Sequence, residues 1–476
     1  MKKSFLLVTL LFTVSLLFAQ EAEVNEHIEN LTGPFSSPQE VTKACLECHE
    51  EVGAEILASR HWNWAEAHGT TIPEGKVNLG KKNTINNFCI AVPSNYPRCT
   101  SCHIGYGWKD ASFDFSKEEN IDCLVCHDQT GKYSKDPKGA GMPKKDVDLL
   151  EIAQNVGPTN RENCGNCHFY GGGDEGVKHG DMDGSLLNPT ADFDVHMGGQ
   201  DFSCAECHTA TEHKISGKSH SSRYMGTGTD VNCESCHEGE IHKKKKLNAH
   251  AKSIACQTCH IPTFAKKIPT KMWWDWSTAG TKAVAKNDEF GKPDFVNKKG
   301  HFKRGKNVVP EYKWYSQSSG AYLLGDVIDP SQPVVLNPLN AKITDKDAKI
   351  APFKVMRTKQ PYDSERNIIV TPKLFGKGGF WASLKEESSP EEKWIAATEK
   401  GMAVVSEEFS GKIGWVETEM NWPINHMVVP AKKALKCNAC HGKKATRMDW
   451  EALGYPNGDP KVKKNGGGRE KLGLIK

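Results

Sequence analysis

Cysteine and histidine residues recur in this chain at one fixed spacing. Sixteen of the seventeen cysteines fall into eight copies of the pattern Cys-x-x-Cys-His. Residues three and four apart lie on one face of a helical turn, so the thiols and the imidazole of each copy point to the same side. This is the attachment pattern of c-type haem, in which both cysteines form thioethers with the porphyrin and the histidine binds its iron. The cysteines are Cys45, Cys48, Cys99, Cys102, Cys123, Cys126, Cys164, Cys167, Cys204, Cys207, Cys233, Cys236, Cys256, Cys259, Cys437 and Cys440, and the histidines are His49, His103, His127, His168, His208, His237, His260 and His441.

The two-cysteine part of the pattern has other uses, since Cys-x-x-Cys also occurs in zinc sites, redox dithiols and disulfide frameworks. Here every copy is followed at once by histidine, and the eight copies together use all but one cysteine. That regularity favours haem over the alternatives. We predict eight covalently bound haem c groups and no metal beyond haem iron.

The N-terminal segment predicts export. Two lysines precede an apolar run from Phe5 to Phe18, and small or polar residues follow it. These are the parts of a secretory signal peptide, residues 1–19, with cleavage near Ala19. An uncleaved anchor is the alternative, but the apolar run is short for a membrane span. Because haem is attached to c-type cytochromes outside the inner membrane, we expect an exported, soluble protein of the bacterial periplasm with no membrane span after processing.

The low apolar content of the chain fits a protein whose core consists largely of cofactor. Only 37% of the residues are apolar and the mean hydropathy is −0.57, which is low for a chain of this size. Eight porphyrins would supply the missing apolar surface by packing on one another and on side chains. The net charge of +3 gives no indication of nucleic-acid binding.

Motif spacing divides the chain. Seven motifs lie between residues 45 and 260, and the eighth follows after 176 residues without haem. We expect a seven-haem core over residues 20–260, a haem-free insertion packing on it over residues 261–436, and the eighth haem and C-terminal tail over residues 437–476. Gly and Pro punctuate the first part, so the predicted class is mainly α and irregular, a multihaem cytochrome c core with short helices, long loops and little β structure. A capped helix over residues 389–409 and a short hairpin over residues 365–375 are the clearest elements.

Axial ligation of iron requires further histidines. Each motif supplies one, so eight bis-histidinyl haems would need eight more, and eleven histidines lie outside the motifs. We expect His27, His220 and His301 to be exposed polar residues, and His68 is a reserve. The remaining seven are predicted distal ligands: His61, His179, His196, His213, His242, His250 and His426. One iron would then lack a second histidine, and such an open or labile site can bind substrate, whereas a saturated haem only passes electrons.

The seventeenth cysteine, Cys89, lies ten residues before Cys99. A small buried core residue is the ordinary interpretation of an unpaired cysteine. The functional interpretation places its sulfur beside the haem of Cys99, Cys102 and His103, where positive charge favours the thiolate. A thiolate can attack a sulfur–sulfur bond, which indicates sulfur-oxyanion chemistry.

The motifs and the loops between them resemble those of the octahaem tetrathionate reductases, which are related to the multihaem nitrite reductases and hydroxylamine oxidoreductases. The resemblance extends from about Cys45 to His441 and is carried by NNFCIAVPSNYPRCTSCHIGYGWKD, IDCLVCHDQTGKY, CGNCHFYGGG, VKHGDMDGSL and ACQTCHIPTFAKKIPTKMWWDWSTAG. It implies that seven irons have two histidine ligands and that one has a lysine, with a cysteine close by. On this chain the implied lysine is Lys178, the cysteine is Cys89, and the haem is that of the second motif.

Two acidic residues, Asp174 and Glu175, precede Lys178 by about one turn. A lysine amine binds iron only when it is neutral, and a nearby carboxylate can orient the amine or handle its proton. The family has an aspartate three residues before the lysine, where this chain has Glu175. We expect the nearby segment Asp181–Asp183 to form a solvent-facing turn rather than a calcium site.

The resemblance implies a reductase. Electrons from a periplasmic or membrane-bound donor would reach the Lys178 haem through the seven bis-histidinyl haems. Tetrathionate would there take two electrons and split into two thiosulfates, with nitrite and hydroxylamine as further substrates. The alternative is a non-catalytic multihaem electron-transfer protein that docks partners through Lys243–Lys246, although such a run is ordinarily a solvated face. Hydroxylamine oxidation is a weaker alternative, because no tyrosine stands out for the haem cross-link it requires.

Overall fold

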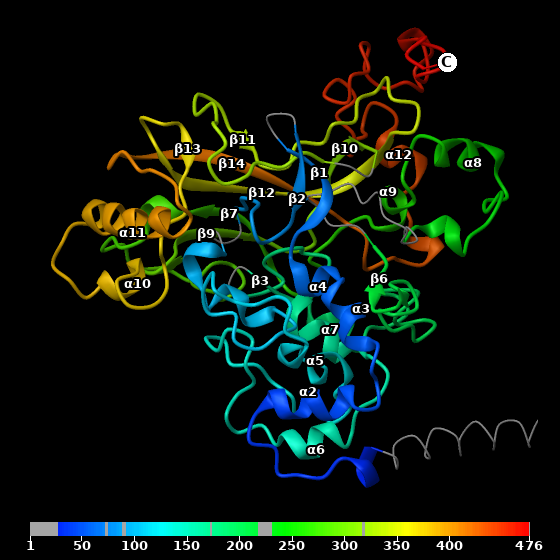
Figure 1. Ribbon diagram of the computed structural model, residues 1–476. Coiled ribbons are helices and arrows are strands. Elements are labelled where there is room, and N and C mark those ends of the chain that lie inside the picture. Colours follow the sequence, from blue (N-terminus) through cyan, green and yellow to red (C-terminus); the bar gives the residue numbers. More distant parts are fainter. Residues whose placement is uncertain are drawn as a thin grey trace, which may run out of the picture. The chain divides into compact units, whose positions relative to one another are not determined.

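The computed structural model describes residues 27–71, 75–87, 92–171, 174–217, 231–316 and 319–475. The predicted signal peptide lies outside these residues. The chain divides into two compact units (Figure 1). The first unit contains residues 1–63, 96–166 and 210–214, and the second contains residues 64–95, 167–209 and 215–476. The three-part division expected from the motif spacing stays a prediction.

The first unit is built from short helices joined by long loops. Helix α2 (Pro38–Leu46) begins where the Ser37 side chain accepts a hydrogen bond from the Glu40 amide, with Pro38 at the first helical position. The other helices of this unit are α3 (Val52–Leu57), α4 (Arg60–Asn63), η2 (Cys99–Cys102), η3 (Glu118–Asn120), α5 (Leu124–His127) and α6 (Leu149–Ala153). The hairpin of β5 (Ala210–Thr211) and β6 (Lys214–Ile215) and the helix α7 (Arg161–His168) extend past its limits.

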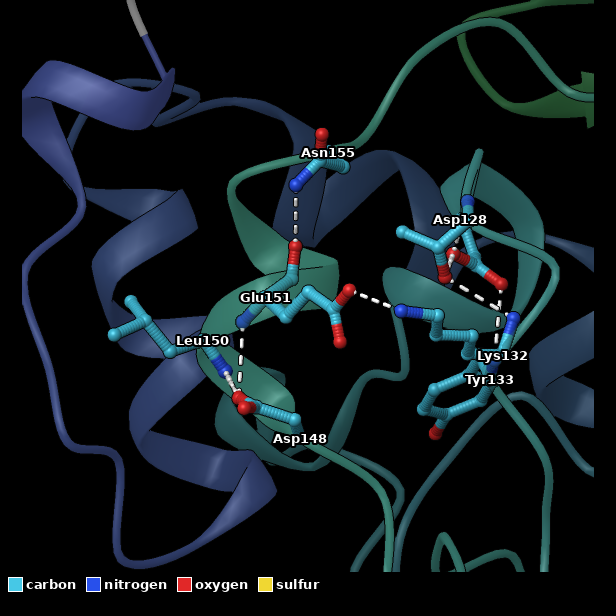
Figure 2. Close-up of polar contacts among 8 residues, drawn as sticks. Asp128, Lys132, Tyr133, Asp148, Leu150, Glu151 and Asn155 are labelled. Atoms are coloured by element: carbon cyan, nitrogen blue, oxygen red, sulfur yellow. Dashed lines mark hydrogen bonds and ion pairs between the residues drawn. The ribbon is translucent and has the colours of Figure 1, made fainter.

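Polar side chains hold the turn that follows the third motif (Figure 2). Asp128, directly after this motif, accepts a hydrogen bond from the Tyr133 amide at 3.0 Å. Asp148 caps α6 by accepting from two backbone amides at its start, groups that the first helical turn leaves without partners. Lys132 and Glu151 form an exposed ion pair that joins the turn to α6.

A buried ion pair connects the second and third motifs. Asp122, directly before the third motif, is 2% exposed and lies 2.9 Å from the Nζ of Lys135. Its carboxylate also accepts hydrogen bonds from the hydroxyls of Tyr106 at 3.0 Å and Tyr133 at 2.8 Å. Lys135 donates in turn to the carbonyl oxygen of His103. Because a buried charge is costly unless it is paired and hydrogen-bonded, these side chains form one interdependent group.

The second unit contains an eight-stranded sheet. Its strands follow in the spatial order β11 (Val334–Val335), β14 (Ile413–Pro423), β12 (Lys349–Asp363), β7 (Thr270–Asp275), β9 (Gly300–Gly305) and β8 (Phe295–Val296), and β10 (Glu311–Tyr315) and β13 (Ile368–Ile369) pair with β12. Strands β12 and β14 are antiparallel from Phe353 opposite Pro423 to Asp363 opposite Ile413, and Figure 1 shows them as long neighbouring ribbons. The core on this sheet includes four tryptophans that are at most 1% exposed: Trp274, Trp276, Trp394 and Trp422.

Short elements complete the second unit. Helix α11 (Pro390–Val404) begins with a reciprocal capping box between Ser389 and Glu392. The strands outside the sheet are β1 (Glu66–Thr71), β2 (Gly75–Leu79), β3 (Tyr170–Gly171) and β4 (Asp174–Glu175). The remaining helices are η1 (Pro93–Asn95), η4 (Gly184–Leu186), η5 (Cys233–Ser235), α8 (Lys245–Ala251), α9 (Cys256–His260), η6 (Trp276–Thr278), α10 (Phe380–Ser383), η7 (Ala431–Lys433), α12 (Cys437–Cys440) and η8 (Lys463–Asn465).

The sheet corrects part of the predicted fold class. Short helices and long loops are present as expected, but the expected mainly α class with little β structure does not describe the second unit, where β12 alone has 15 residues. Helix α11 occupies most of the helix predicted over residues 389–409, and β13 lies within the hairpin predicted over residues 365–375. Within the described ranges, no helix is both long and apolar enough to cross a bilayer.

The buried ion pair predicts a large loss of stability. Asp122→Ala should lower the free energy of unfolding by about 3–5 kcal/mol, because Lys135 would keep a buried charge without a counter-charge. Urea unfolding of the haem-loaded protein, followed by far-UV circular dichroism, measures this. The matched control is Asp110→Ala, an exposed aspartate of the same unit, which should change stability by about 0.5 kcal/mol or less. Equal losses in the two variants would contradict the prediction.

Candidate functional site

The motifs form compact turns that present their cysteines and histidine together. Elements η2, α5, α7, η5, α9 and α12 each contain residues of one motif. In five motifs the histidine amide donates to the carbonyl of the first cysteine at 2.9–3.2 Å, which closes a helical turn: His49, His127, His208, His237 and His441. This local geometry fits covalent haem at these five motifs.

Histidines from outside the motifs lie opposite motif histidines at a narrow range of distances. An imidazole nitrogen binds a first-row metal at about 2 Å, so two imidazoles on opposite sides of one iron have ring centroids about 6 Å apart. Five pairs of rings have centroids 6.1–6.4 Å apart: His27 with His49, His196 with His237, His208 with His426, His242 with His260, and His250 with His441. These separations suit an iron between the two rings of each pair.

Hydrogen bonds at Nδ1 orient these rings. In seven histidines Nδ1 lies 2.6–3.2 Å from a backbone, carboxylate or amide oxygen: His127, His208, His213, His242, His250, His426 and His441. These oxygens accept hydrogen bonds, so Nδ1 carries the hydrogen and Nε2 keeps the lone pair that a metal needs. Burial also lowers the pKa of His127, His208 and His260, which favours the neutral ring.

The histidines outside the motifs differ in what their rings lie against, and their positions in the sequence did not show this. His196, His242, His250 and His426 each lie opposite a motif histidine, and His213 is an electrostatic neighbour of His127. His61 lies in α4, and the ring of His179 meets Trp422 edge-on at 4.8 Å. His301 bonds Thr278 through Nδ1 and packs on Phe295. His220 and the side chain of His68 lie outside the described residues.

Sequence reasoning missed His27. Instead of being an exposed polar residue, it is half-buried and stacks opposite His49 with an interplanar angle of 17°. A signal was available, because His27 is the only histidine that precedes the first motif.

Lys178 lies in a loop that the sheet holds in place. Its Nζ is 5.2 Å from the centroid of the Trp422 ring on β14. Lys354, fully buried on β12, donates to the carbonyl oxygens of Val177 and Lys178, and to the Thr270 hydroxyl at 2.6 Å. Burial lowers the pKa of Lys354 to about 7. The buried amine therefore fixes the backbone of the loop directly at Lys178.

The acidic residues near Lys178 bond mainly to backbone amides. Glu175 accepts from the Gly184 amide at 2.7 Å, and Asp174 lies 3.7 Å from the Nζ of Lys292. Asp181 and Asp183 are 1% and 0% exposed, so the expected solvent-facing turn is wrong. Asp181 accepts hydrogen bonds from both the amide and the Nδ1 of His426, which ties this segment to a paired histidine. In the part of the chain that the structure describes, no cluster of three or more His, Cys, Asp or Glu residues suits a further metal.

The second motif lies in an aromatic pocket of the first unit. His103 is fully buried, its Nε2 is 2.6 Å from the Trp62 carbonyl oxygen, and its ring centroid is 4.8 Å from that of Trp108. Burial lowers the pKa of His103 to about 3. Cys89 lies outside the described residues, so its predicted position beside this haem stays a prediction.

Motifs, turns and histidine pairs together define a multihaem c-type cytochrome. Three family models match separate parts of the chain: Cytochrome c554 and c-prime over residues 44–128, Cytochrome c7 and related cytochrome c over residues 190–269, and Cytochrome c bacterial over residues 271–444. The chain is similar to the octaheme cytochrome c from Shewanella oneidensis in its crystal structure, with 47% identity, a TM-score of 0.86, and coverage of 93% of this chain and 99% of that chain.

A more distant relative is an uncharacterized protein of Archaeoglobus fulgidus, 26% identical over 251 residues that cover 41% of this chain and 82% of that protein. From the likeness to the Shewanella protein, the chain belongs to the octahaem cytochrome c family. Its eight motifs accordingly hold eight covalently bound haem c groups.

The contact between β12 and the Lys178 loop predicts a local loss of stability. Lys354→Met removes the donor from two backbone carbonyls, and an unsatisfied buried acceptor costs about 1–3 kcal/mol. Amide hydrogen exchange of residues 176–181 should therefore speed up by about tenfold or more. Lys359→Met, half-buried on the same strand, is the matched control. Equal exchange in both variants would show that Lys354 does not position the loop.

Proposed function

We propose that this octahaem cytochrome is a periplasmic reductase that converts tetrathionate to thiosulfate. The catalytic haem is that of Cys99, Cys102 and His103, and Lys178 is its distal ligand. The five imidazole pairs at 6.1–6.4 Å carry this proposal, because they account for both axial positions of five haems by histidine. Saturated haems pass electrons, so the chemistry belongs to an iron with a different ligand.

The pairs leave a short list of ligands for the remaining irons. His213 is the distal ligand of the third motif, beside His127. Two predicted distal histidines, His61 and His179, then remain for the irons of His168 and His103. His61 is an electrostatic neighbour of His103, but the family resemblance implies a lysine at this iron, so we assign it the amine of Lys178.

Contacts between motif cysteines trace the path of electrons. The sulfur atoms of Cys45 and Cys123 are close neighbours, as are those of Cys233 and Cys256. Since each of these sulfurs is bonded to a porphyrin in the mature protein, each contact marks a place where the edges of two haems meet. Further close neighbours are Cys207 with Cys236, and Cys259 with Cys437 and Cys440. In the second unit the fifth to eighth haems therefore form a continuous series.

In this proposal the second-motif haem and Lys178 together bind a dianionic sulfur compound. The haem supplies electrons and a coordination position there. Lys178 is neutral while it is a ligand, and as a free ammonium it attracts tetrathionate. Two electrons break the central sulfur–sulfur bond and release two thiosulfates, so no proton is consumed. Cys89 either attacks sulfur covalently or shapes the pocket, and Asp174 or Glu175 orients the amine or handles its proton. A labile amine also leaves room for nitrite and hydroxylamine.

Removal of the amine and the thiol tests the reaction. A Lys178→Ala, Cys89→Ala double variant should lose about 10- to 100-fold in tetrathionate reduction, since a hydrogen bond to a charged group contributes about 1.5–3 kcal/mol. The measurement is steady-state reduction with a dye donor, after the pyridine haemochrome assay has shown eight haems. Lys282→Ala, an exposed lysine of the second unit, is the control and should retain full activity. Full activity in the double variant would exclude the proposed site.

Paramagnetic resonance tests the ligand assignment. The wild-type spectrum should contain one signal that differs from the bis-histidinyl signals, and Lys178→Ala should abolish it. Eight bis-histidinyl signals would instead support the alternative, a non-catalytic electron-transfer protein. Of His61→Ala and His179→Ala, one should convert a bis-histidinyl haem to high spin and the other should not. His301→Ala, in the sheet, should leave every signal unchanged.

A further inference from the structure

Two lysine-rich segments meet at the haem of the eighth motif. One consists of the turn before α8 and the first residues of that helix. The other consists of the residues directly before and after α12. The ring pair of His250 on α8 with His441 after α12 joins them, and Figure 1 shows these helices beside each other. We call seven exposed lysines of these segments the lysine surface: Lys243, Lys244, Lys245, Lys246, Lys436, Lys443 and Lys444.

The C-terminal segment, residues 431–476, has a net charge opposite in sign to that of the rest of the chain. Residues 431–476 contain twelve basic and four acidic residues, a net charge of +8, whereas the whole chain has a net charge of +3. Residues 1–430 therefore carry a net charge of −5. Two of the four acidic residues accept hydrogen bonds within the segment: Asp459 from Nδ1 of His441, and Asp449 from the Ala452 amide. The segment that contains the eighth motif is thus the basic part of the sequence.

That haem lies at one end of the series in the second unit. Cys259 of the seventh motif is a close neighbour of Cys437 and Cys440, which links the eighth haem to the series on one side. Cys437 is exposed, so this motif also reaches the surface. A haem at the end of a series and at the surface is suited to exchange electrons with another protein.

We propose that the lysine surface docks an acidic redox protein, which delivers electrons at the haem of Cys437, Cys440 and His441. Opposite charges steer two proteins into encounter and orient their facing patches. A redox protein is favoured over other polyanions, because the lysines surround a group whose chemistry is electron exchange. This inference rests on the electron-carrying role of the chain and does not depend on Lys178 as a ligand or on tetrathionate as the substrate.

Stopped-flow reduction of the haems by reduced flavodoxin, an acidic redox protein used as the probe, tests the docking. The full haem-loaded protein is used and no substrate is added, so the result does not depend on whether the protein reduces tetrathionate. The second-order rate constant of the wild type should fall steeply as salt rises. Lys244→Glu, Lys443→Glu should lower it by about tenfold or more at low ionic strength and flatten its salt dependence.

The matched control reverses two exposed lysines beside α10, which lies across the second unit from α8 in Figure 1. Lys377→Glu, Lys385→Glu makes the same change in net charge and should keep the rate within about twofold of the wild type. Circular dichroism and haem spectra confirm folding of both variants, and salt dependence of the wild type gives a measurement independent of mutation.

Three outcomes would overturn the inference. The first is an equal loss of rate in the two double variants, since net charge would then explain the effect. The second is a wild-type rate that does not depend on salt. The third is binding of the wild type to phosphatidylglycerol vesicles that Lys244→Glu, Lys443→Glu abolishes without any change in the flavodoxin rate, which would assign the lysine surface to an anionic membrane.

Discussion

Two imidazoles that bind one iron must reach its opposite sides, and five histidine pairs of this chain have the spacing that this requires. The Cys-x-x-Cys-His motif fixes one side locally, but the second ligand comes from elsewhere. His208 and His426 are 218 residues apart in sequence and yet have ring centroids 6.4 Å apart. A haem bound by two such rings would act as a cross-link and would restrain distant segments of a chain whose apolar content is low.

Ligation also requires that the rings be turned the right way. Hydrogen bonds at Nδ1 do this with different acceptors: a backbone carbonyl for His127, His208 and His250, and a side-chain carboxylate for His213, His426 and His441. Each bond leaves Nε2 as the metal-binding atom. The variety of acceptors explains why no second sequence motif marks the distal ligands.

Prediction from the sequence succeeded where the chemistry is local. The spacing of cysteine and histidine identified the haems, their number and the short turns that carry them. It could not show which distant histidines meet, so His27 was missed although it lies opposite His49. The sheet was missed because β12 does not look like a strand: Pro352, Pro361, Lys354 and Arg357 interrupt it, and its buried face includes polar side chains. The buried Asp181–Asp183 segment was misjudged for the same reason, since its carboxylates bond backbone amides brought in by the fold.

The unpredicted sheet is what positions the proposed catalytic lysine. Strand β12 supplies Lys354, whose amine holds the carbonyl oxygens at Lys178, and β14 supplies Trp422 beside the side chain. The chain leaves β14 at Pro423 and reaches His426 three residues later, where Asp181 of the Lys178 loop orients the imidazole. The same sheet therefore fixes both the loop of the proposed amine ligand and a histidine of the pair that includes His208. In the second unit, the haem-free strands determine where an amine and an imidazole can lie, whereas the motifs determine only where porphyrins attach.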